Sequence, residues 1–563
     1  MNINLTQRQV RLWLCISSVI LSLLWAAIAR LILRPMLELA YRGKGLPALS
    51  NLVLQLEQPR NWLIWRLDTL TKVGFIFFLG FGLLFWVTTS RTFFSKFVGK
   101  ATAETLGFIR ILSCGFLLAS VVVEDLPSSA LLPPEMRVPM GFIDLLYQLP
   151  IGFDSLVRSI AGLWFFKILT ALILLTGTIG WKTRFSIPIG VFLYLVYGGL
   201  IRHYEHFGHT GMIPAYLLIV LCFTPCGDGL SVDRRRRIAK GEVIAPADEY
   251  LPIYGWSRYA CWIVMAFVYL SAGLSKVTKG GLLWWHPTNI QVIVFKDSLN
   301  PAWVDFGLGL HLISAPKFFF AFLGLMGLLV ELGYVAVLFS RIARYIFPPL
   351  MGMIHLGILL LQNVAFFDLM LLQVIFYDFT KIRQAITQKK RGATVPEIAL
   401  SHAASENPRS DRIATSNFFY PTFAILLVLF LCFVWMYRIE YYPVTAWQMY
   451  SERKMDPSVR YYKILAQRES GEITPINLDR GIGVMSNSRY KRVTRKFCFK
   501  PETVPTCQKY LQATASAYNK KVPPSQQIVQ FIIQKWNWKF SDRSSPEETS
   551  QLQEEFIFKP EEN

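Results

Sequence analysis

The chain has 563 residues, of which 53% are hydrophobic, and its mean hydropathy is +0.37. This apolar content exceeds what one soluble core needs, so it excludes a soluble globular protein and indicates an integral membrane protein in a lipid bilayer. The formal charge is +21, but much of the basic charge stands in short loops between apolar runs, where it governs membrane insertion. We therefore expect no nucleic-acid partner.

The apolar residues gather in runs of roughly 17 to 25, the length that lets a helix cross about 30 Å of hydrocarbon. We expect about eleven transmembrane helices, of which the ninth and tenth would also fit one broken helix. The runs lie near residues 12–33, 72–90, 106–123, 158–179, 186–202, 209–226, 253–278, 317–339, 346–362, 365–379 and 418–437.

Basic loops are retained in the cytoplasm, so their positions predict the orientation of the chain. This alternation puts the N-terminus in the cytoplasm, the loop 203–210 outside, and the chain after about residue 438 in the periplasm or lumen. Three strongly basic segments serve as the cytoplasmic anchors: 231–240, 340–344 and 380–391.

We expect five regions along the chain. The third of them is rich in small and polar residues, which is typical of a linker. The regions are an N-terminal transmembrane pair with its loops (1–104), a helical body (105–390), a cytoplasmic linker (391–417), a last transmembrane helix (418–437) and an extracytoplasmic C-terminal domain (438–563).

The C-terminal region contains stretches such as RYYKILAQRES and SQQIVQFIIQKWNWKF, whose period-two alternation predicts strands. We therefore expect a small α+β or mostly β domain. Its basic section (480–500) is interpreted as a hairpin that faces anionic headgroups, an acidic partner or simply water. The acidic end, SSPEETSQLQEEFIFKPEEN, is expected to fray.

Two pairs of cysteines stand close together in the sequence. Cys498 and Cys507 lie in the tail assigned to the outside, where a disulfide closing a short loop is expected if the compartment is oxidising. Cys222 and Cys226 form CFTPC near a span end, and either packing or a thiol redox pair explains them.

Ionisable side chains inside spans cost about 2.5 to 3.5 kcal/mol each on insertion scales, so they mark candidate sites. Depth along the helices places three of them near the outer interface and two nearer the midplane. We expect all five to line one pocket that opens outward. Each also has a structural explanation, such as a lysine that reaches to the headgroups or a pair that fixes helix register. The outer three are His209, Lys276 and Asp368, and the deeper two are Glu331 and His355.

Two further patterns flank these residues. Trp284 and Trp285 follow Lys276 and are interpreted as interfacial belt residues, or alternatively as a substrate wall. The spacing of His203, His206 and His209 fits one helical face, but without a carboxylate or cysteine complement we expect no metal site.

Six segments carry a further pattern: FIRILSCGFLL (108–118), TGTIGWKTRFS (176–186), GHTGMIPAYLLIVLCFTPCGDGLSVD (208–233), VYLSAGLSKV (268–277), VELGYVAVLF (330–339) and MIHLGILLLQNVAFFDLMLL (353–372). The A-G-x-x-K helix end at Lys276, combined with the upstream histidine and S-V-D, is its most specific part. In this order the segments together resemble the HTTM domain, the membrane module shared with vitamin K-dependent γ-glutamyl carboxylase.

This resemblance implies a reduced, vitamin K-like quinone as cofactor and Lys276 as the base that deprotonates it. Burial favours the neutral form of an amine, which can accept a proton. The resemblance also implies that His209 holds or polarises the reacting oxygen. The sequence departs from the family where Gly208 replaces an asparagine, where TKGGLLWWHP replaces an acidic segment after the lysine, and in its shorter outer tail.

Two functions follow as hypotheses. The first is a carboxylase-like or epoxidase-like membrane enzyme that acts on a quinol or modifies an exported peptide, with Glu331, His355, Asp368 and the two tryptophans shaping the pocket. The alternative is a non-catalytic scaffold that binds an exported protein partner through its C-terminal domain. A transporter ranks lower, because we see no inverted-repeat pairing of broken helices.

Overall fold

The computed structural model describes residues 7–44, 46–47, 50, 53, 59–150, 152–204, 208–301, 306–390, 418–541 and 543–561. The expected linker 391–417 and His206 lie outside these residues. The chain forms two compact units, and each is considered by itself. Unit 1 contains 1–100, 251–263 and 396–433, and unit 2 contains 101–250, 264–395 and 434–563.

Within the described residues, nine helices are long and apolar enough to cross a membrane, as an integral membrane protein requires. The two other expected spans, 209–226 and 365–379, are represented by shorter apolar helices, Met212–Cys222 and Phe367–Phe376. The nine are Arg11–Tyr41, Arg60–Thr88, Ala103–Val123, Ile160–Ile179, Thr183–Arg202, Pro252–Gly280, Lys317–Leu338, Ala343–Gln362 and Phe419–Met436.

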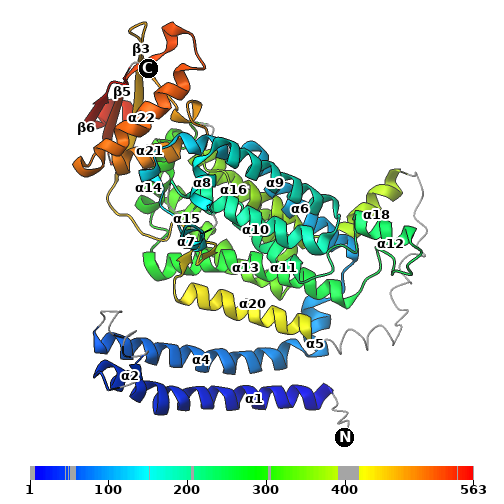
Figure 1. Ribbon diagram of the computed structural model, residues 1–563. Coiled ribbons are helices and arrows are strands. Elements are labelled where there is room, and N and C mark those ends of the chain that lie inside the picture. Colours follow the sequence, from blue (N-terminus) through cyan, green and yellow to red (C-terminus); the bar gives the residue numbers. More distant parts are fainter. Residues whose placement is uncertain are drawn as a thin grey trace. The chain divides into compact units, whose positions relative to one another are not determined.

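Unit 1 is built around two long helices that lie side by side, α1 (Gln7–Ile28) and α4 (Arg60–Thr88) (Figure 1). They approach closely because Gly82 has no side chain: a Cβ there would lie 2.7 Å from that of Ser18. The other elements of the unit are η1 (Ala29–Leu33), α2 (Arg34–Tyr41), α5 (Arg91–Phe93), η2 (Phe94–Val98), the start of α13 (Pro252–Gly280) and most of α20 (Phe419–Met436).

The membrane body of unit 2 is a packed set of helices (Figure 1). Its α16 ends at Gln362 and is followed by Asn363 in a left-handed conformation (φ 56°), so the ninth and tenth runs form separate helices. The helices are α6 (Ala103–Val123), α7 (Phe142–Gln148), α8 (Phe153–Arg158), α9 (Ile160–Ile179), α10 (Thr183–Arg202), α11 (Met212–Cys222), α12 (Val232–Ala239), the rest of α13, α14 (Pro287–Ser298), α15 (Lys317–Gly333), α16 (Ala343–Gln362), α17 (Phe367–Leu372) and α18 (Phe379–Lys390).

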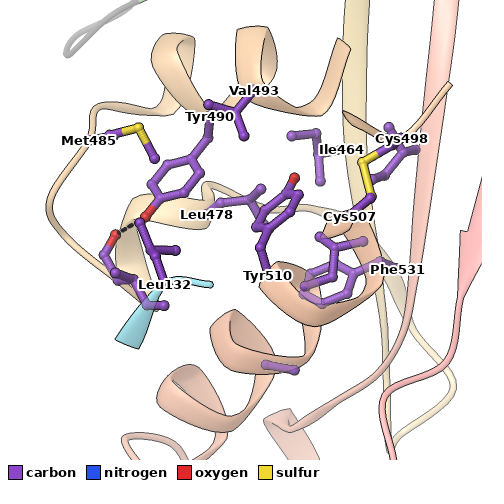
Figure 2. Close-up of a cluster of buried hydrophobic side chains, with 14 of the residues drawn as sticks. Leu132, Ile464, Leu478, Met485, Tyr490, Val493, Cys498, Cys507, Tyr510 and Phe531 are labelled. Atoms are coloured by element: carbon purple, nitrogen blue, oxygen red, sulfur yellow. Dashed lines mark hydrogen bonds between the residues drawn. A yellow bond between two sulfur atoms is a disulfide. The ribbon is translucent and has the colours of Figure 1, made fainter. Parts of the chain in front are cut away.

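The C-terminal domain is α+β. Its antiparallel sheet has the strand order β4–β3–β5–β6. Helices α21 (Asn487–Phe497) and α22 (Val504–Asn519) pack against the sheet around a buried core that includes Tyr490, Tyr510 and Phe531 (Figure 2). The strands are β3 (Ser458–Arg468), β4 (Ile473–Pro475), β5 (Ile528–Lys539) and β6 (Gln551–Phe558), and a separate two-stranded ribbon pairs β1 (Glu440–Tyr441) with β2 (Val444–Thr445).

The four cysteines singled out by the sequence differ in state. Cys498 and Cys507 form a disulfide in the core shown in Figure 2. Cys222 and Cys226 are free thiols, of which Cys226 is buried. The Cys226 carbonyl instead accepts a hydrogen bond from a buried arginine, Arg110, at 2.6 Å.

Two expectations for this domain were wrong. The basic section 480–500 is not a hairpin, because Tyr490, Val493 and Phe497 recur at helical spacing and are buried along one face of α21. The acidic end is not frayed, because it forms edge strand β6, whose Glu554 pairs with Lys535 on β5. The first expectation rested on period-two alternation and the second on acidic charge. Both are local patterns, and neither records the buried core that α21 packs against or the partner strand β5.

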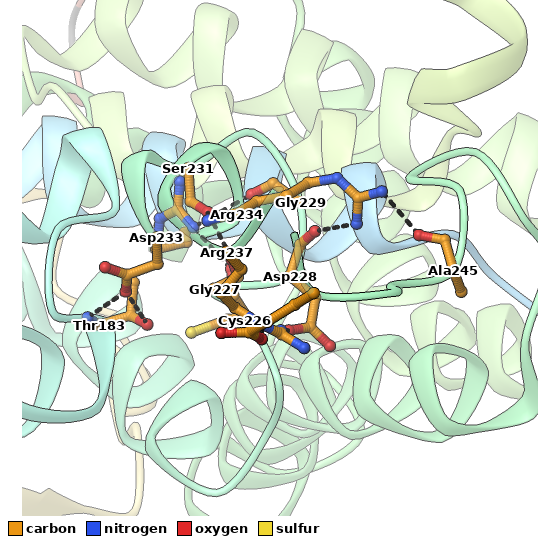
Figure 3. A network of polar contacts seen from close by, with 12 residues as sticks. Thr183, Cys226, Gly227, Asp228, Gly229, Ser231, Asp233, Arg234, Arg237 and Ala245 are labelled. Carbon is orange, nitrogen blue, oxygen red and sulfur yellow. Dashed lines mark hydrogen bonds and ion pairs between the residues drawn. The ribbon is translucent and has the colours of Figure 1, made fainter. Parts of the chain in front are cut away.

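The S-V-D segment has a structural role at the ends of two helices (Figure 3). Ser231 caps α12, accepting a hydrogen bond from the Arg234 amide at 2.9 Å. Asp233 accepts hydrogen bonds from the amides of Lys182 and Thr183 at 2.7 and 2.8 Å, and from the Thr183 hydroxyl at 2.8 Å. Asp233 therefore supplies acceptors to the start of α10 that the helix itself cannot provide.

Replacing Asp233 with alanine should lower the free energy of unfolding by about 1 to 3 kcal/mol, because it leaves the two amides and the hydroxyl without their acceptor. The midpoint of thermal unfolding of the detergent-purified protein, followed by size-exclusion chromatography after heating, measures this. Asp248→Ala, at an exposed position, is the matched control. Equal midpoints for the two variants would contradict the capping role.

Candidate functional site

Lys276 lies in the last turns of α13 and forms a buried ion pair with Glu331 of α15. Its Nζ atom donates to both carboxylate oxygens of Glu331, at 2.8 and 2.7 Å. Only 7% of the lysine side chain and 19% of the glutamate side chain are exposed. The predicted lysine thus has a carboxylate partner rather than headgroup water as its neighbour.

The pair depends on a close approach of α13 and α15 at a glycine. A Cβ at Gly273 would lie 3.0 Å from side-chain atoms of Leu332 and 3.2 Å from its amide nitrogen. Gly273 stands three residues before Lys276, and Leu332 directly follows Glu331. The small residue of the A-G-x-x-K helix end therefore lets the two charged side chains meet.

Trp284 forms an aromatic wall beside this pair. The Lys276 Nζ atom lies 5.2 Å from the centroid of the indole, within range of a cation–π interaction. The indole N–H donates to the carbonyl of Tyr450 at 2.7 Å, and the Trp284 carbonyl accepts from Asn289 at 2.7 Å. Trp284 also belongs to the apolar cluster around α14 and β5, and Trp285 packs against that cluster.

A second polar group lies on the same face of α13. Tyr269, seven residues before Lys276, has its hydroxyl 3.1 Å from Nε2 of His355 on α16. Gln373 donates to the Tyr269 hydroxyl at 2.7 Å and to the Leu369 carbonyl at 2.8 Å, and its amide oxygen accepts from Tyr334. His355 is also close enough to interact electrostatically with Lys276.

These contacts favour one tautomer of His355. A backbone carbonyl only accepts, so Leu369 fixes the Gln373 amide with its NH₂ toward Tyr269. The Tyr269 hydroxyl then accepts from Gln373, and its own proton points to Nε2 of His355. The neutral imidazole therefore carries its proton on Nδ1, which is buried and has no hydrogen-bond partner within the described residues. Such a donor costs free energy until an acceptor reaches it.

His209 belongs to a third group, formed with the segment that follows the last span. Its Nε2 atom lies 3.2 Å from the Thr445 hydroxyl, which donates to Glu440 at 2.7 Å. The His209 ring lies 5.0 Å from that of Trp447. Glu440 lies at an exposed position of β1, and partial desolvation of its carboxyl raises the pKa above its usual value of about 4.5.

Asp368 positions the start of α11 just after His209. Its carboxylate accepts hydrogen bonds from the Gly211 amide and from the Leu369 amide, each at 2.9 Å. The side chain is buried, with 2% of the residue exposed. Asp368 therefore fixes the backbone at Gly211, which lies two residues after His209 in the chain.

The predicted residues therefore fall into neighbouring groups. Lys276, Glu331 and Trp284 are in direct contact, whereas His355 is joined to α13 through Tyr269. The segment 440–451 contacts two of the groups, because Thr445 binds His209 and the Tyr450 carbonyl binds Trp284. Sequence reasoning missed Glu440, Thr445, Trp447 and Tyr450, although polar and aromatic residues directly after the last span were a visible signal.

Two other features of the described residues bear on ligands. A groove of about 600 Å³ lies in unit 1, and it contains none of the residues above. Within the described ranges, no group of three or more His, Cys, Asp or Glu could hold a metal ion. The groove is lined by Ala26, Ala27, Arg30, Leu31, Thr71, Lys72, Phe75 and Ile76.

A comparison of the chain with models of known protein families found no match, and searches of curated proteins and of solved structures found none either. The site must therefore be interpreted from its own geometry.

The raised pKa of Glu440 predicts a pH-dependent stability. The folded state binds the proton of this carboxyl more tightly than the unfolded state, so its contribution to stability falls as pH rises from about 4.5 through the raised pKa. Glu440→Gln should remove this decline. Compared with the wild type, the variant should therefore be relatively more stable at neutral pH than at pH of about 4. Unfolding midpoints across this range measure it.

The control for this experiment is Glu452→Gln, at an exposed position on the same segment. A Glu440→Gln variant whose midpoint follows the wild-type pH profile would show that this carboxyl does not titrate with folding.

Proposed function

We propose that this protein is a membrane enzyme of the HTTM and carboxylase-like type, in which Lys276 and Glu331 together accept a proton from a reduced, vitamin K-like quinol. The observation that carries the proposal is the buried contact of one ammonium with both oxygens of one carboxylate, beside an indole. Titratable groups with a specific charged partner in an apolar setting are candidates for proton chemistry.

The pair accepts the proton as a unit. Before the reaction it holds an ammonium and a carboxylate. A bound quinol would supply the proton of its O–H group, which the Glu331 carboxylate would accept, while the Lys276 ammonium would stabilise the negative charge left on the ligand oxygen. No electrons are transferred in this step. This differs from a mechanism based on a neutral amine alone, because the glutamate is the final proton acceptor.

Other residues would hold the ligand. The Nδ1–H of His355 offers a hydrogen bond to a second ligand oxygen, and Trp284 offers a flat apolar face beside the reacting one. His209 and Asp368 belong to the neighbouring wall that includes Thr445. An amphipathic quinol would reach such a site by lateral diffusion in the bilayer.

We also propose that the C-terminal domain lies outside the cytoplasm, in the periplasm or lumen, with the N-terminus in the cytoplasm. The Cys498–Cys507 disulfide supports this side, because such bonds persist in oxidising compartments. The basic segments 231–240 and 380–391, which largely form α12 and α18, support it as well.

Exchanging the lysine and the glutamate tests whether the pair is catalytic or only structural. Lys276→Met should abolish the quinol-dependent reaction, followed as product epoxide, and should destabilise the fold by roughly 3 to 5 kcal/mol by leaving Glu331 buried without its partner. The exchange Lys276→Glu with Glu331→Lys should restore much of the stability but not the activity, because the ammonium and carboxylate change places.

The matched control is Lys279→Met, one turn further along α13 at an exposed position, which should keep both properties. An active exchange variant, or an active Lys276→Met variant, would remove the pair from the mechanism.

A second candidate function is a scaffold that captures an exported protein. It is favoured by the outer face of α21, where Arg495 and Lys496 are exposed while Tyr490, Val493 and Phe497 are buried. Such a face suits an acidic partner.

If the scaffold function holds, crosslinking in native membranes should yield a discrete adduct that Arg495→Glu combined with Lys496→Glu abolishes. Lys520→Glu, exposed after α22, is the control for a general loss of positive charge. An adduct that survives the double substitution, and also deletion of the chain after residue 440, would defeat this function.

A further inference from the structure

Three adjacent side chains outside the proposed proton site share an unusual property. Within the described residues, four of their buried polar atoms have no hydrogen-bond partner: Nη1 of Arg137, the hydroxyl of Tyr147, and both ring nitrogens of His203. Buried polar atoms are satisfied in the great majority of cases, so each exception requires an explanation. Four exceptions at one place point to a group that binds there.

The local structure brings the three side chains together. The His203 and Tyr147 rings are 5.5 Å apart, and the Val138 amide donates to the His203 carbonyl at 2.9 Å, which places the neighbouring Arg137 beside the histidine. Arg137 is held in turn by a hydrogen bond from its Nε to the Tyr204 hydroxyl at 3.2 Å. Arg137 and His203 interact electrostatically as well.

The chemistry of the free atoms selects the ligand. A guanidinium offers only donors, a phenol offers a donor, and an imidazole offers at least one. Burial lowers the pKa of His203 to about 3, so the ring is neutral at ordinary pH and the arginine supplies the positive charge. His203 is the most enclosed of the three, with 1% of the residue exposed. A neutral imidazole has one donor and one acceptor nitrogen, so a ligand with several acceptor oxygens and one negative charge satisfies three of the four free atoms.

We infer that Arg137, Tyr147 and His203 form a binding site for the carboxylate group of a small ligand, separate from the Lys276–Glu331 pair. A planar carboxylate presents two acceptor oxygens, which suits the in-plane N–H donors of a guanidinium flanked by a hydroxyl and an imidazole. The site is formed by Arg137 before α7, Tyr147 near the end of α7 and His203 directly after α10, at the loop that the positive-inside pattern assigns to the outer face. It does not depend on the quinol reaction.

Acetate is the probe for this site. The thermal unfolding midpoint of the detergent-purified full chain should rise with sodium acetate, relative to sodium chloride at equal ionic strength, as expected for a ligand that binds only the folded state. Tyr147→Phe should weaken the apparent acetate affinity roughly tenfold and Arg137→Met should abolish the response, because each removes a donor.

The Tyr147→Phe variant makes the test sharp. The Tyr147 hydroxyl has no partner among the residues that the structure describes, so in chloride the variant should be at least as stable as the wild type, and it should fall behind only in acetate. Arg158→Met is the matched control, because Arg158 is exposed in the adjacent helix α8 and should leave the acetate response intact. A wild type that responds equally to acetate and chloride, or a Tyr147→Phe variant that keeps the full acetate response, would overturn the proposal.

Discussion

The ion pair between Lys276 and Glu331 is the constraint around which unit 2 is organised. Moving two charges out of water costs several kcal/mol for each ion, and only good geometry with further contacts offsets that cost. The bidentate contact, the indole of Trp284 and the approach at Gly273 supply them. Replacing such a pair by apolar residues is often neutral or stabilising, so its presence here is better explained by chemistry than by stability.

The segment after the last span is a structural part of the membrane site. It binds His209 through Thr445, and it binds the Trp284 indole through the Tyr450 carbonyl. The Tyr450 hydroxyl also donates to Asp297 on α14 at 2.9 Å, and α14 packs Phe295 against Trp538 of the sheet, with ring centroids 5.4 Å apart. The C-terminal domain and the candidate site are thus joined by a short chain of direct contacts.

The sequence predicted the helical body well, because hydrophobic run length depends on local composition alone. It also placed Lys276 at the end of α13 and Cys498 within reach of Cys507. It could not predict that Glu331 would face Lys276, since depth along a helix carries no information about the direction a side chain takes in the bundle. The sequence offered Trp284 as an interfacial belt residue or as a substrate wall, but it did not predict the contact of this indole with Lys276.

Other errors share a physical cause. The basic section 480–500 alternates in sequence, yet Tyr490, Val493 and Phe497 satisfy a helical period and the buried core selects the helix. The terminal strand β6 exists because β5 offers it an edge, which no local pattern records. The cluster of Arg137, Tyr147 and His203 combines three separated positions whose side chains meet only after α10 and its neighbouring loops pack.

The central claim is that the Lys276–Glu331 pair takes up a proton when a quinol binds. Infrared difference spectroscopy of the purified protein with and without reduced quinone tests it most directly, with Glu331→Gln to assign the signal. The account predicts that quinol binding produces the C=O stretch of a protonated carboxyl group, which the Glu331→Gln variant lacks. A carboxylate that stays ionised while quinol is bound would contradict it.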